Sequence, residues 1–143
     1  ILISFWRILI KSILNFNNIE IAQILVSIFF SIVFFQSSID KINDRSGNLK
    51  FFNHHFKGTL FQNYISISLN FLVLLEITSA SLCCLGIFYK LSYHDSIFIY
   101  YGLLISAIVL LSLLFGQRLA KDYAGAADIT IYFILCIVTI LSF

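Results

Sequence analysis

The chain places few ionisable side chains inside its long apolar stretches, and Glu76 is the most exceptional of them. It lies near the middle of the apolar run 64–88, and on a helix Ser79 and Cys83 share its face at spacings of three and seven residues. A charged carboxylate at the centre of a bilayer costs about 2.5–3.5 kcal/mol. No basic residue lies in the central turns of any apolar run, so we expect Glu76 to face a bundle interior, protonated, and to donate a hydrogen bond.

Further polar side chains in the apolar runs predict that Glu76 belongs to a polar seam inside the bundle. Asp128 and Tyr132 lie one helical turn apart near the start of the run 124–143. We define the polar seam by five residues: Glu76, Ser79, Cys83, Asp128 and Tyr132. Two interpretations stay open, because such a seam serves either interhelical hydrogen bonds of about 0.6–2 kcal/mol each or the binding of a quinone, a lipid or a proton.

A second polar cluster lies in the junction 115–128, FGQRLAKDYAGAAD, between two apolar runs. Its polar members are Gln117, Arg118, Lys121 and Asp122, and the small residues 124–127 follow. A guanidinium can hold a carboxylate in a bidentate pair, so we expect Arg118 to pair with Asp122 or Asp128 instead of reaching lipid headgroups. Small residues let another backbone approach closely. The junction is therefore a predicted architectural or functional site at one face of the membrane.

The other reactive residue types carry weaker signals. His54 and His55 are adjacent, so on a helix they point about 100° apart, which favours solvated or headgroup-facing rings over a shared metal. Cys83 and Cys84 are vicinal, and the sequence has no C-x-x-C redox pair. It also has no recognisable nucleophile–base pair, metal-binding cluster or nucleotide-binding loop. We therefore expect no metal, no catalysis by the chain on its own, and no cofactor other than a bound quinone or lipid.

Composition places these residues in a membrane. Hydrophobic residues make up 60% of the 143, charged residues 11%, and the mean hydropathy is +0.99, whereas a soluble domain is about a quarter charged. The apolar runs cover residues 21–39, 64–88, 97–115 and 124–143. Each is long enough to cross a hydrocarbon core of about 30 Å as a helix. Short turns after the second and third runs predict an all-α, up-down four-helix transmembrane bundle with both termini on one side.

The first 18 residues are predicted to form a separate unit. Ser4, Arg7, Lys11 and Asn15 follow one another at steps of three and four, which puts a polar stripe on an otherwise apolar helix. This pattern favours an interfacial amphipathic helix in residues 1–18, followed by a membrane domain in residues 19–143. A simple extension of the first span is the open alternative.

Several strings in the chain resemble small membrane proteins of the DoxX family, particularly those of Bacteroidota. The most specific is FGQRLAKDYAGAA at 115–127, which resembles the junction between the third and fourth spans of that family. The remaining similarities are FQSSIDKI at 35–42, Gly47-Asn48, His55-Phe56 and Leu75-Glu76. The resemblance covers residues 21–143 and departs at Ser37-Ser38, where many relatives have Ser-Gly. It implies a four-helix, multi-pass protein of a bacterial inner (cytoplasmic) membrane.

The resemblance also implies a function class. The family takes its name from a small subunit of a thiosulfate:quinone oxidoreductase, so we expect an accessory or structural subunit of a larger membrane complex, including a quinone-linked redox or respiratory complex. The alternative is a binder or carrier of a small apolar molecule, a quinone or a lipid, at the polar seam around Glu76. The expected partners are the lipid bilayer and other proteins. Nucleic acid is not expected, because the net charge is only +2 and the basic residues are scattered.

Basic residues are unevenly distributed between the two predicted faces of the membrane. More of them lie in the first and third loops than near the N-terminus and in the second loop. The positive-inside rule then predicts that the first and third loops are cytoplasmic and that both termini lie outside.

Overall fold

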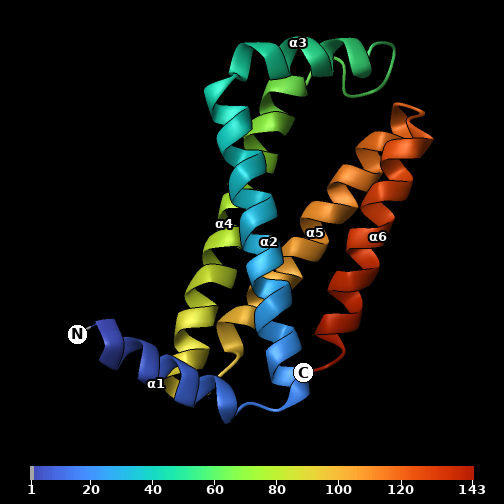
Figure 1. Ribbon diagram of the computed structural model, residues 1–143. Coiled ribbons are helices and arrows are strands. Elements are labelled where there is room, and N and C mark those ends of the chain that lie inside the picture. Colours follow the sequence, from blue (N-terminus) through green and yellow to red (C-terminus); the bar gives the residue numbers. More distant parts are fainter. Residues whose placement is uncertain (1) are drawn as a thin grey trace.

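The computed structural model describes residues 2–143, apart from the side chains of residues 5, 8, 9 and 12–14. The described part of the chain is helical and contains no strand (Figure 1). The helices are α1 (Leu2–Leu14), α2 (Asn18–Asn43), α3 (Arg45–His55), α4 (Ile65–Tyr93), α5 (Ile97–Leu119) and α6 (Tyr123–Ile140). Four of them, α2, α4, α5 and α6, are long and apolar enough to cross a membrane. The prediction of an all-α, four-helix membrane bundle is confirmed.

The four spans run alternately up and down, so both chain ends lie at the same end of the bundle, as predicted (Figure 1). The short helix α3 crosses the opposite end. Helix α4 packs against both α2 and α5, whereas α6 packs mainly against α5. The α2–α4 pair and the α5–α6 pair diverge toward the end where α3 lies (Figure 1).

Local side-chain contacts set the ends of α2. Asn17 forms a capping box: its side chain accepts a hydrogen bond from the Glu20 backbone N–H at 2.8 Å, and the Glu20 carboxylate accepts from the Asn17 N–H at 3.0 Å. A cap of this kind contributes about 0.5–2 kcal/mol. At the other end, the Asp44 side chain caps α3 by accepting from the Gly47 N–H at 3.1 Å. The chain therefore turns at Asp44 and continues as α3 across the end of the bundle.

Two glycines let α4 and α5 touch almost backbone to backbone. A Cβ on Gly86 would lie 2.6 Å from the backbone nitrogen of Ile99, and one on Gly102 would lie 2.7 Å from the sulfur of Cys83. Hydrophobic association is weak between helices that already lie in lipid, so close packing of small residues takes its place. The glycines thus set the distance between α4 and α5.

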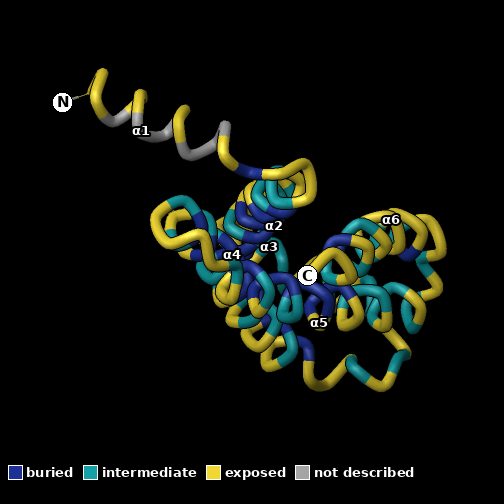
Figure 2. Tube along the Cα trace, turned by 90° about the horizontal axis from the view of Figure 1, so that it is seen from below, coloured by how far each residue is buried: buried dark blue, intermediate teal, exposed yellow. Residues whose placement is uncertain are grey.

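The interior of the bundle is narrow, and its outer surface is apolar. Phe30, Leu103 and Val109 are fully buried in the core, whereas Leu74 and Ile131 are 61% and 65% exposed on the outside. Figure 2 shows the buried residues between the helices and the exposed ones around them. A surface of this kind suits contact with lipid, as predicted for a multi-pass membrane protein.

Helix α1 lies outside the four-helix bundle (Figure 2), at the end of the bundle where the chain terminates (Figure 1). The described side chains Trp6, Arg7 and Lys11 are exposed. Phe16 anchors the connection to α2, since it is buried, with its ring 5.0 Å from that of His94. This position is compatible with the predicted interfacial helix.

Candidate functional site

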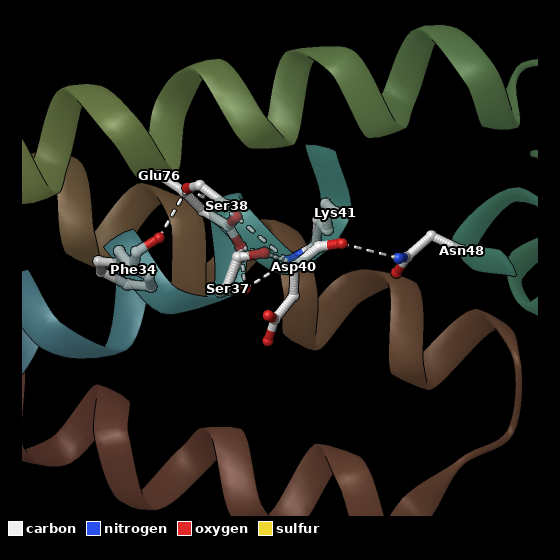
Figure 3. A network of polar contacts seen from close by, with 7 residues as sticks. All are labelled: Phe34, Ser37, Ser38, Asp40, Lys41, Asn48 and Glu76. Atoms are coloured by element: carbon white, nitrogen blue, oxygen red, sulfur yellow. Dashed lines mark hydrogen bonds and ion pairs between the residues drawn. The ribbon is translucent and has the colours of Figure 1, made fainter. Parts of the chain in front are cut away.

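Glu76 is fully buried, as expected, but it is part of an ion pair. The ammonium nitrogen of Lys41 lies 3.0 and 3.1 Å from its two carboxylate oxygens. The hydroxyl of Ser37 donates to the same carboxylate at 3.0 Å, and the hydroxyl of Ser38 lies 3.4 Å from it while donating to the Phe34 carbonyl at 2.6 Å (Figure 3). The expectation that no basic side chain reaches Glu76 is therefore wrong. Helix α2 continues to Asn43, beyond the apolar run predicted from the sequence, and its last turn brings Lys41 inward.

The network around Glu76 is closed. Lys41 also donates to the hydroxyl of Ser37 and, at 3.4 Å, to its backbone carbonyl. Among the described residues, no buried side-chain nitrogen or oxygen lacks a hydrogen-bond partner. Because burying a charge is favourable only when it is paired and hydrogen-bonded, this arrangement explains how a carboxylate is tolerated in the bundle interior. It leaves no free group at Glu76 to hold a ligand.

A second ion pair joins α2 to α4 at the other end of the bundle. Lys90 lies 2.7 Å from the Glu20 carboxylate and donates to the Ser96 hydroxyl, also at 2.7 Å. Each of the two helices carries an acidic residue followed by a basic one, so their antiparallel packing brings opposite charges together at both ends. Sequence reasoning missed Glu20 and Lys90. The repeated acid–base order at the two ends of the first two spans is the signal that could have found them.

The α4 part of the predicted polar seam lies in the interior. The Ser79 hydroxyl is 2.6 Å from that of Ser106 and donates to the Gly102 carbonyl at 3.1 Å. Cys83 is fully buried against Gly102. These contacts join α4 to α5 and require no ligand.

The α6 part of the predicted seam does not join it. Asp128 is exposed and makes no hydrogen bond or ion pair with the described residues, and Tyr132 is 39% exposed with its ring against Phe29. Helix α6 packs inward through Ala126 and Cys136. This packing turns Asp128 and Tyr132 outward, so their placement in an interior seam was wrong.

The predicted pair between Arg118 and a carboxylate is also absent from the described residues. Arg118 is exposed, and its guanidinium carbon lies 4.7 Å from the centre of the Tyr123 ring. The Asp122 carboxylate instead caps α6 by accepting from the Gly125 N–H at 2.9 Å. A cap fixes this carboxylate at the helix start, which leaves Arg118 to a cation–π contact.

His55 takes the place of Arg118 in the polar cluster of the junction. Its Nε2 lies 3.0 Å from the Gln117 side-chain oxygen and 3.9 Å from the Asp122 carboxylate. Lys121 is exposed, with a φ of +60°, a backbone conformation usually taken by glycine after a helix. The junction thus holds Gln117 and Asp122 in a contact with α3, while Arg118 and Lys121 face outward. Sequence spacing could not reveal a contact between residues 62 positions apart.

A pocket of about 310 Å³ lies next to this cluster, between α3, the start of α4 and the end of α5. Its lining is largely apolar and includes six phenylalanines: Phe51, Phe52, Phe56, Phe61, Phe71 and Phe115. The polar residues of the lining are His55, Ser68, Ser112 and Gln117. Nothing in the sequence pattern marked this pocket, because three separate segments form it.

One polar group of the pocket lining, the Ser68 hydroxyl, is available to a ligand. The Ser112 hydroxyl donates to its own helix, to the Ile108 carbonyl at 2.9 Å. By contrast, the Ser68 hydroxyl makes no hydrogen bond with the described residues, while the side-chain nitrogen of Gln117 lies against Gly125 of α6, outside the pocket lining. The Ser68 hydroxyl can donate to an oxygen atom placed in the pocket.

Comparisons of the chain with protein families, curated proteins and solved structures give no match. Within residues 2–143, no group of three or more His, Cys, Asp or Glu side chains is placed to hold a metal ion. The pocket and the polar clusters are therefore the features from which a function can be inferred.

Proposed function

We propose that this membrane protein binds a small amphiphilic molecule of the bilayer, a quinone or a lipid, in the pocket beside α3. The pocket itself is the observation that carries the proposal. It has a volume of about 310 Å³, a wall rich in phenylalanine, and polar groups from α3, α4 and α5. Small-molecule sites are typically apolar concavities of roughly 300–1,000 Å³ with a few polar groups that orient the ligand.

The proposed site lies apart from Glu76. Leu72 and Leu75 of α4 line the pocket, whereas Glu76 faces α2 and is bonded to Lys41. Successive residues of a helix point about 100° apart, so one helix can serve both places. In this proposal the ion pair holds α2 against α4, and the pocket binds the ligand.

Filling the pocket should weaken ligand binding. Ser112 lines the pocket and is itself exposed, so Ser112→Trp is expected to occupy part of the cavity without crowding the core. We expect it to reduce binding of a short-chain quinone or of co-purified lipid about tenfold or more, a loss of about 1.4 kcal/mol, measured by native mass spectrometry. Leu111→Trp is the matched control, since Leu111 is exposed on the neighbouring position and does not line the pocket. Equal binding by the two folded variants would contradict the proposal.

A second candidate is an accessory-subunit role in a larger membrane complex, and Asp128 favours it. Helix α6 is the least buried of the four spans, and it exposes this carboxylate without a partner among the described residues. Ionisable groups in membrane segments are costly unless they are satisfied, and a basic side chain on a partner protein would satisfy this one. We propose a complex of the kind implied by the DoxX resemblance, including a quinone-linked one in a bacterial inner membrane.

Removing the charge at this position tests the second candidate. Asp128→Asn should reduce the assembly of the native complex, seen as a shift to smaller size on a native gel of mildly solubilised membranes. Asp40→Asn is the control, because Asp40 is also exposed but lies at the end of α2. A complex of unchanged size in both variants would count against a role for Asp128 in assembly.

We also propose that the α3 end of the bundle faces the cytoplasm. The exposed basic residues there are Arg45, Lys50, Lys57, Arg118 and Lys121. The positive-inside rule supports this orientation, with both termini on the other side.

A further inference from the structure

We propose that helix α3 is a lid over the pocket and that a latch at His55 holds it shut against α5 and α6. The latch consists of three side chains: His55, Gln117 and Asp122. Its release lets α3 move away from α5 and opens the pocket. The latch then sets the rate at which a ligand enters and leaves, a consequence that rests on the proposed function.

Packing holds α3 only weakly. The helix has no buried residue, and it packs against α2 and α4. Segments with few buried apolar contacts open locally at a low cost in free energy. Even so, α3 forms part of the pocket wall, through Phe51, Phe52 and His55. A movement of α3 therefore opens the pocket without disturbing the packing of the four spans.

The N-terminal end of α3 is tied to α2 and α4. The chain turns from α2 into α3 at Asp44, whose side chain caps α3. The Arg45 guanidinium donates to the Asn70 side-chain oxygen at 2.6 Å and to the Ser66 hydroxyl at 3.2 Å, both on α4. This end of α3 stays in place and acts as the hinge, as element-terminal residues do in other domain and lid closures.

The C-terminal end of α3 is held by the latch. His55 Nε2 lies 3.0 Å from the side-chain oxygen of Gln117 on α5 and 3.9 Å from one oxygen of Asp122, whose other oxygen caps α6. Among the described residues, these are the only polar contacts between α3 and the α5–α6 pair. The connection after α3 adds an aromatic contact, in which the Phe61 ring lies 6.0 Å from that of Phe115.

The connection from α3 to α4 leaves room for this end to move. Gly58 has a φ of +78°, a conformation that glycine adopts without strain. A Cβ built on Gly58 would meet no atom within 4 Å, so the backbone there lies in open space. Figure 1 shows the loop at the end of α3, before the chain returns to α4. The lid thus has a fixed hinge at one end and an uncrowded connection at the other.

Hydrogen exchange measured by mass spectrometry, with the full chain in phosphatidylcholine nanodiscs, tests the latch without any ligand. A detached α3 of 11 residues is too short to remain a stable helix, so its amides lose protection whenever the lid opens. His55→Phe keeps an aromatic ring beside Phe51 and removes the ring nitrogens. It should raise the exchange rate of the α3 amides about fivefold, the effect of losing one hydrogen bond. Gln117→Leu should act in the same way from α5, and His54→Phe is the control, since His54 is exposed on α3.

Thiol labelling tests whether the movement opens the pocket. Ser68→Cys places a thiol in the half-buried lining, and a water-soluble maleimide should label it faster in each latch variant, by about the same factor as the exchange rate. Ile67→Cys is the control, because Ile67 is exposed and lies outside the lining, so its labelling rate should not change. Mass spectrometry of the labelled peptides separates these thiols from the native cysteines.

The lid and the proposed function fail in different ways. Unchanged α3 exchange in both latch variants would overturn the lid, as would an equal increase in His54→Phe or in the amides of α4 and α5. Faster α3 exchange without faster labelling of Ser68→Cys would also overturn it, because the movement would not open the pocket. Equal ligand binding by the Ser112→Trp and Leu111→Trp variants would instead contradict the proposed function, whatever the exchange of α3.

Discussion

Lys41→Met should destabilise the protein severely. The substitution leaves the Glu76 carboxylate fully buried without the ammonium group that now lies 3.0 Å away. Breaking a buried pair by removing one partner costs about 3–5 kcal/mol. The expected result is a large drop in folded yield and in the thermal unfolding temperature measured in detergent.

Two companion variants separate the loss of the pair from other effects. The double substitution Lys41→Met with Glu76→Gln should recover most of the stability, because replacing both partners of a buried pair is often close to neutral. Lys50→Met should have little effect, since Lys50 is an exposed lysine of α3. A single variant as stable as wild type, or a double variant no better than the single one, would show that the pair contributes little.

Gly86→Ala should separate α4 from α5. The new Cβ would lie 2.6 Å from the Ile99 backbone nitrogen, and a backbone atom inside a helix cannot move aside cheaply. Overpacking of this kind costs typically about 1–3 kcal/mol, which outweighs the gain of about 1 kcal/mol from replacing glycine by alanine in a helix. We expect a lower unfolding temperature and a lower folded yield.

Gly116→Ala is the matched control within the same helix pair. Its Cβ would meet only the Phe56 ring, at 3.3 Å, and the side chain of this residue, which directly follows α3, can shift by a few tenths of an ångström. We expect this variant to be neutral or slightly stabilised through the higher helix propensity of alanine. If Gly86→Ala and Gly116→Ala lowered the unfolding temperature equally, the close contact of α4 with α5 would not explain the effect at Gly86.

The location of the pocket makes α4 the element shared by the ion pair and the binding site. Leu75 lines the pocket, and its neighbour Glu76 holds α2 through Lys41. A change that tilts α4 would therefore alter the pocket wall as well as the α2–α4 contact. For this reason, both the stability and the ligand binding of the Lys41→Met variant should be measured. A loss of ligand binding can be assigned to the pocket only where the variant is still folded.

The sequence by itself determined the class of the protein and the order of its spans. The length and polarity of the apolar runs are local properties of the sequence. Because a bilayer core holds no water to bond the backbone, a continuous apolar run satisfies its own N–H and C=O groups by forming a helix. Short connections then make neighbouring spans antiparallel, so both chain ends lie together. The burial of Glu76, Ser79 and Cys83 was also predictable, because polar groups in the middle of a span are stabilised by partners inside the bundle.

Only the tertiary structure decided which residues are partners and which face outward. Rotation of α6 about its axis turned Asp128 away from the interior, and the extension of α2 brought Lys41 to Glu76. The contact of His55 with Gln117 joins positions 62 residues apart. Such contacts depend on how each helix is rotated about its axis and on how closely it approaches its neighbours. For α4 and α5, close packing at Gly86 and Gly102 sets this approach. The hydrophobic pattern of a single span does not encode it.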